Sequence, residues 1–101
     1  MAAEIAFSRL LRLLEDLADL LSVAGQEAWS RRLETIRSTL NEAPGDYHRE
    51  QAAVRGILSL YGGMGSFQDL VLQDARGVRP EHEEFDQLRD QLFEEARAAL
   101  R

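Results

Sequence analysis

The spacing of apolar residues in the first quarter of the chain predicts one long amphipathic helix. Apolar side chains recur there at intervals of three and four residues, which places them on one face of an α-helix. These residues are Phe7, Leu10, Leu11, Leu14, Leu17, Ala18 and Leu21. Gly25 follows where a glycine in the left-handed conformation would end the helix. This helix should form the centre of the core.

Narrower apolar stripes predict three more helices. The second runs from about Gln26 to Asn41, the third follows Asp46 as its N-cap, and the last begins at Pro80. Their core faces contain Trp29, Leu33, Ile36 and Leu40; then Tyr47, Val54, Ile57, Leu58 and Tyr61; then Phe85, Leu88, Leu92, Ala96 and Ala99. Gly56 lies inside the third helix, where glycine is unfavourable, so it predicts a close approach of two helices.

The patterns together predict an all-α fold, a compact four-helix domain in which residues 1–101 form one unit. A chain of 101 residues with 45% hydrophobic residues can form one core without metals or disulfides, and it contains no cysteine. The start lacks the basic region of a targeting signal, and no apolar run approaches the ~20 residues of a membrane span. We therefore expect a cytoplasmic protein.

Three of the seven glycines lie within residues 62–65, between two predicted helices. Glycine is used where the backbone needs a positive φ or a close approach, so this loop is either functional or a tight corner. Ser66 to Asp69 has the form of a capping box, which predicts a short helix from Phe67. A small β-hairpin is the alternative for residues 67–79.

The glycine loop does not match a nucleotide-binding motif. All twelve basic residues are arginines, so the P-loop lysine is absent, and the incomplete G-x-G-x-x-G pattern follows a helix where a strand is required. Three interpretations remain: a structural corner, a loop presented to a protein partner, or an anion site assisted by Arg55 or Arg76. Ser66 is better explained as a helix cap than as a nucleophile.

The stretch from Tyr61 to Leu70, followed by a glycine-containing turn and a charged closing helix, resembles a family of small uncharacterised bacterial domains that share a GGMGS-type stretch. The resemblance covers about the second half of the chain. It implies a compact bacterial domain, and it implies no chemistry for individual residues.

The charge distribution argues against nucleic acid as a partner. The net charge is −6, and none of the three segments 1–42, 43–77 and 78–101 is basic. Phosphate backbones would be repelled, whereas a basic protein would be attracted. The two histidines, His48 and His82, are far apart, and His82 with Asp86 is a weak metal pattern. We expect no catalytic residues, cofactor or metal, and therefore no enzyme.

These observations favour a non-enzymatic immunity-type protein that neutralises a bacterial toxin or effector by direct binding. The candidate partner-binding residues are Glu15, Asp16, Asp19, Gly63, Met64, Ser66, Phe67, Glu81, Glu83 and Glu84. One alternative is a small regulatory domain that binds an anionic ligand at the Gly62–Gly65 loop. The other is a structural homodimer that uses surplus apolar surface of the first helix.

Overall fold

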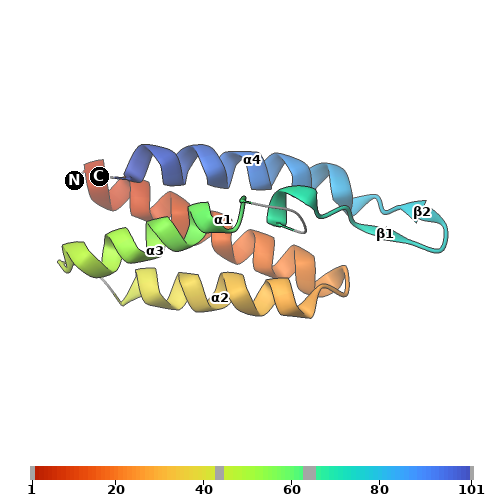
Figure 1. Cartoon of the computed structure of the whole chain (residues 1–101), viewed down its shortest axis with the longest axis horizontal. Helices are drawn as coiled ribbons and strands as arrows, with labels where there is room; N and C mark the ends of the chain where they lie inside the picture. Colours follow the sequence, from red (N-terminus) through yellow and green to blue (C-terminus); the bar gives the residue numbers. More distant parts are fainter. Residues whose placement is uncertain (1, 43–44, 63–65, 101) are drawn as a thin grey trace.

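Four α-helices make up most of the computed structural model, which describes residues 2–42, 45–62 and 66–100 (Figure 1). They are α1 (Ala2–Val23), α2 (Glu27–Asn41), α3 (Tyr47–Ser59) and α4 (Glu81–Ala99). A 3-10 turn, η1 (Phe67–Asp69), and a hairpin of β1 (Gln73–Asp74) and β2 (Gly77–Val78) separate α3 from α4. The all-α, four-helix prediction is confirmed.

Local signals set the helix ends as the sequence predicts. Gly25 follows α1 with a φ of 82°, and the backbone N–H of Gln26 donates to the Leu21 carbonyl at 2.8 Å. The Asp46 carboxylate accepts a hydrogen bond from the backbone N–H of Arg49 at 3.1 Å, which caps α3. Pro80 directly precedes α4 and already has a helical backbone conformation.

The helices form an antiparallel bundle in which α1 contacts α2 and α4, and α3 contacts the same two helices. The start of α1 and the end of α4 lie at the same end of the bundle, because α4 returns antiparallel along α1 (Figure 1). Leu10, Leu14, Leu17 and Leu21 of α1 are fully buried. The predicted role of this helix as the centre of the core is confirmed.

The helix α3 extends along only part of the length of the bundle, and the segment that contains η1 extends along the rest (Figure 1). The Phe67 ring is fully buried, and its centroid lies 5.0 Å from that of Trp29 on α2 and 5.4 Å from that of Phe85 on α4. One aromatic side chain therefore completes the core where α3 has ended.

Both alternatives for residues 67–79 occur in short form. The helical part is the single turn η1, and the hairpin pairs Gln73 with Val78 and Asp74 with Gly77 in antiparallel register. Gly77 has a φ of 112°, which only glycine adopts without strain.

Two predictions for α3 are wrong. Tyr47 is the first residue of α3 and is 53% exposed, since the contact with the end of α4 is made one turn later by Gln51, whose buried side chain donates to the carbonyl of Ala99. The Tyr47 ring packs edge-on against that of the neighbouring His48. At Gly56, an added Cβ would lie 4.0 Å from Cγ1 of Ile36, an ordinary contact, so no close approach requires this glycine.

Candidate functional site

The segment from Ser66 to Leu72 packs against α2 and α4 without forming a long helix, so its backbone polar groups need hydrogen-bond partners outside a helix. The N–H of Phe67 donates to the carbonyl of Leu60 at 2.8 Å. At the other end, the carbonyl of Leu72 accepts from the N–H of Arg79 at 2.8 Å. Between these two points, the carbonyl of Phe67 accepts from the N–H of Leu70 at 3.3 Å, and the carbonyls of Gln68 and Leu70 accept from no described backbone N–H. All three carbonyls have lone pairs for side-chain donors.

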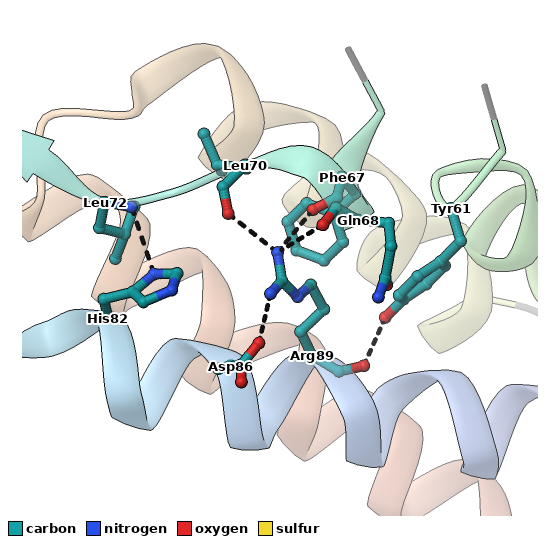
Figure 2. A network of polar contacts seen from close by, with 8 residues as sticks. All are labelled: Tyr61, Phe67, Gln68, Leu70, Leu72, His82, Asp86 and Arg89. Atoms are coloured by element: carbon teal, nitrogen blue, oxygen red, sulfur yellow. Dashed lines mark hydrogen bonds and ion pairs between the residues drawn. The ribbon is translucent and has the colours of Figure 1, made fainter. Parts of the chain in front are cut away.

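Arg89 of α4 supplies those donors (Figure 2). Its side chain is almost completely buried, and Nη1 donates to the carbonyls of Phe67 at 2.9 Å, Gln68 at 3.2 Å and Leu70 at 2.9 Å. Its Nη2 forms an ion pair with the carboxylate of Asp86, one turn earlier on α4. We call Arg89, Asp86 and the three carbonyls the Arg89 clamp.

Tyr61 and His82 extend this network on either side (Figure 2). The Tyr61 hydroxyl donates to the backbone carbonyl of Arg89 at 2.7 Å, and burial raises the pKa of this phenol far above its ordinary value. The N–H of Leu72 donates to Nδ1 of His82 at 3.3 Å, so this nitrogen acts as an acceptor. These contacts fix the segment on α4.

The clamp is a structural device rather than a reactive centre. The guanidinium of Arg89 is bound by backbone carbonyls and Asp86, which leaves its charge compensated. Two buried polar atoms, Ser66 Oγ and Arg89 Nε, have no hydrogen-bond partner among the described residues. Within those residues, no group of three or more histidine or acidic side chains could hold a metal ion. His82 and Asp86 serve the network instead.

The predicted capping box at Ser66 is wrong. Ser66 does precede η1, but its hydroxyl makes no capping hydrogen bond. The backbone N–H of Asp69 donates to the backbone carbonyl of Ser66 at 3.0 Å, as a single 3-10 turn requires. The N–H of Asp69, which the capping box assigned to the Ser66 hydroxyl, therefore donates to the Ser66 carbonyl instead.

A small groove lies beside this segment, between the start of α2 and the chain from Ser66 to Gln73. It has a volume of about 290 Å³ and is lined by Trp29, Ser66 and Val71 among others. Trp29 is half-buried, and the guanidinium of Arg32 lies 4.7 Å from its ring centroid. The ring contributes to the core on one side and to this groove on the other.

A larger groove, with a volume of about 940 Å³, runs between α1 and α4. We call it the α1–α4 groove. Leu13 and Leu88 contribute apolar surface, and Leu88 is only partly buried. The charged residues of its walls are Arg9, Arg12, Asp16, Asp90, Glu94 and Glu95. The two grooves lie on opposite sides of the bundle, because η1 packs between α2 and α4, across from α1.

The charges in the α1–α4 groove are only partly paired. Arg9 forms an ion pair with Glu95 at 3.2 Å, and Arg12 forms one with Asp16 at 3.5 Å. Asp90 and Glu94 are exposed and have no ion pair or hydrogen bond to any described side chain. Two carboxylates one helical turn apart are therefore left facing solvent beside an apolar floor.

The predicted acidic residues do not come together in one place. Asp16 lines the α1–α4 groove, whereas Glu15 and Asp19 are exposed on α1 outside its lining. Glu81, Glu83 and Glu84 occupy the first turn of α4. The Arg79 guanidinium, which lies 3.2 Å from the Glu81 carboxylate, lowers the pKa of Glu81 through a hydrogen bond.

The residues predicted around the glycine loop also separate. Phe67 is fully buried, so its ring belongs to the core and cannot contact a partner. Ser66 lines the small groove. Gly63 and Met64 lie outside the described residues.

Sequence reasoning missed Arg89, although a signal for it exists. Arg89 lies four residues after Phe85 and three before Leu92, both of them predicted core positions of the last helix. A charged residue at such a position must find partners inside the fold.

The comparisons with known proteins place the chain in one family. A model of a domain of unknown function, DUF6966, matches residues 22–81, more than half of the chain. The chain belongs to the DUF6966 family. The DUF6966 match extends from the end of α1 to the first residue of α4, so it contains the glycine loop and the clamped segment but not Arg89.

No curated protein and no solved structure matches this DUF6966 chain. Across the described ranges 2–42, 45–62 and 66–100, none of its helices is long and apolar enough to cross a membrane.

Proposed function

We propose that this protein is a non-enzymatic, cytoplasmic binding domain of the immunity type, which neutralises a bacterial toxin or effector by direct contact. The observation that carries the proposal is the α1–α4 groove, where Asp90 and Glu94 stand unpaired beside an apolar floor. Exposed, uncompensated carboxylates attract a basic partner, and the adjoining apolar surface gives that partner area to bury.

The total charge supports the same proposal. The chain carries a net charge of −6, and its last segment contributes seven acids against four arginines. Such a field speeds the encounter with a basic protein and makes association sensitive to salt. The exposed acids at the start of α4, Glu83 and Glu84, extend this field toward the hairpin end of the bundle.

The alternative of an anionic ligand at the glycine loop has less support. Arg89, the buried cation nearest to the segment after the loop, is bound by three carbonyls and by Asp86. Its donors are therefore committed to the fold rather than offered to a ligand.

The test begins with capture of a partner from a lysate of the native host, followed by expression of that partner with and without this protein. We expect the partner to be basic and to arrest growth, and we expect co-expression of this protein to restore growth. A captured partner whose toxicity is unchanged by co-expression would contradict the proposal.

The electrostatic part is tested by association kinetics with the purified partner. Reversal of Glu83 and Glu84 to arginine should slow association by about tenfold or more and weaken its salt dependence. The control reverses Glu42 and Glu50, which changes the net charge equally at the ends of other helices. Equal rates for the two variants would remove the α4 acids from the model.

A further inference from the structure

The α1–α4 groove is long enough to hold two turns of a helix. Its walls are residues 8–16 of α1 and 88–95 of α4, two antiparallel helices. At 1.5 Å per residue, the α1 wall is about 12 Å long, or two helical turns. A third helix can lay its side chains into the groove between two packed helices.

The two walls of the groove differ in charge, and this difference favours one orientation of a bound helix. On the α1 wall, Arg9 and Arg12 precede Asp16, and both arginines already hold acids of the groove. On the α4 wall, Asp90 and Glu94 are four residues apart and have no described partner. Residues four apart on a helix face the same side, so these two carboxylates repel each other until a cation approaches.

We infer that the α1–α4 groove binds one amphipathic helix of a partner protein, with its apolar stripe on Leu13 and Leu88 and a basic flank against Asp90 and Glu94. This inference rests on the proposed function and names the part of the partner that this protein recognises. The binding mode is a helix in a groove, in which apolar anchors supply affinity and the charged flank sets the orientation.

The charge pattern specifies the basic residues of that helix. Asp90 and Glu94 are one turn apart, so arginines or lysines on the partner at positions i and i+4 match them in spacing. Glutamates at the same positions would add like charges to an acidic wall and would be rejected. A basic helix therefore binds, and its acidic counterpart does not.

The probe is a synthetic 18-residue peptide with leucines at helical spacing, arginines along one flank, and alanine and glutamine elsewhere. A matched peptide has glutamate in place of each arginine. Fluorescence anisotropy at low salt measures the binding of each labelled peptide to the full chain. We expect the arginine peptide to bind and the glutamate peptide to bind at least about tenfold more weakly.

Variants of the protein locate the binding. Reversal of Asp90 and Glu94 to arginine should raise the Kd of the arginine peptide by about tenfold or more, since both contacts become repulsive. Reversal of Glu42 and Glu50, which changes the net charge equally outside the groove, should change the Kd by less than about threefold. Asp90→Asn with Glu94→Gln is the second variant if the reversed protein does not fold, and it should also weaken binding.

Four results would overturn the inference. Three concern the peptides: no binding of the arginine peptide to the wild-type chain, equal losses in the groove and control variants, or equal affinity for the two peptides. The fourth is a dimer that dissociates on reversal of Asp90 and Glu94, which would assign the groove to a second copy. Each result leaves the proposed function open to its own test, because restored growth measures neutralisation independently of where the partner binds.

Discussion

Replacement of Arg89 by methionine should destabilise the protein more than the same replacement at any other arginine. Methionine keeps most of the apolar contact with the core but donates no hydrogen bond. The change would leave the carbonyls of Phe67, Gln68 and Leu70 without the Nη1 donor. It would also release Asp86, whose half-exposed carboxylate can be solvated by water.

The expected loss follows from these contacts. A hydrogen bond from a charged donor contributes about 1.5–3 kcal/mol, and the bond to Phe67, whose carbonyl keeps the N–H of Leu70 as a second donor, is the buried one of the three. The bonds to Gln68 and Leu70 are partly buried, so water replaces part of what they lose. Removal of the unpartnered Nε–H offsets part of the cost. The net loss should be about 2–3 kcal/mol, or roughly 10–20 °C in Tm for a domain of this size.

Urea unfolding followed by far-UV circular dichroism and by tryptophan fluorescence measures this loss. Trp29 is the only tryptophan, and its ring lies 5.0 Å from that of Phe67, so its emission reports on the clamped segment. The matched control is Arg55→Met on the exposed surface of α3, which should cost less than about 0.5 kcal/mol. If Arg89→Met costs no more than this control, the three carbonyls do not depend on Arg89, and the clamp is refuted.

Three further substitutions test other parts of the fold. Ser66→Ala should leave the free energy of unfolding unchanged or raise it by up to ~1 kcal/mol, because the buried hydroxyl has no described partner. A loss of ~1 kcal/mol in urea unfolding would instead show that the hydroxyl caps η1. Gly56→Ala should stabilise the protein by about 0.5–1 kcal/mol, since the added Cβ meets only Ile36 at 4.0 Å, and a lower Tm would show that α2 and α3 cannot accept it. Because the pKa of Tyr61 is raised in the folded protein, its phenol ionises first in the unfolded chain, so the free energy of unfolding should fall above about pH 10. Tyr61→Phe should lower the free energy of unfolding by about 1 kcal/mol at pH 7 and should show a smaller loss at alkaline pH. If the free energy of unfolding of this variant changed with pH between about pH 8 and 11 as it does in the wild-type protein, this prediction would be contradicted.

The sequence by itself determined the four helices and most of their ends. The apolar period of α1, the glycine after it and the Asp46 cap all act over a few residues, because helical hydrogen bonds and caps join residues three to four apart. The same local information predicted a short helix after the glycine loop, with a small hairpin as the alternative, and the structure contains a 3-10 turn and a two-residue hairpin. It could not predict that Ser66 would lose its capping role.

Only the tertiary structure decided how the segment after the glycine loop is held and which acids come together. The carbonyl partners of Arg89 lie 19 to 22 residues away, and the Phe67 ring contacts Trp29 and Phe85 on two helices. Asp16 and Asp90 line one groove because α4 returns along α1, whereas Glu15 and Asp19, close to Asp16 in sequence, point elsewhere. Which acids share a surface depends on which helices pack side by side. Burial of the whole core, rather than any local pattern, determines that packing.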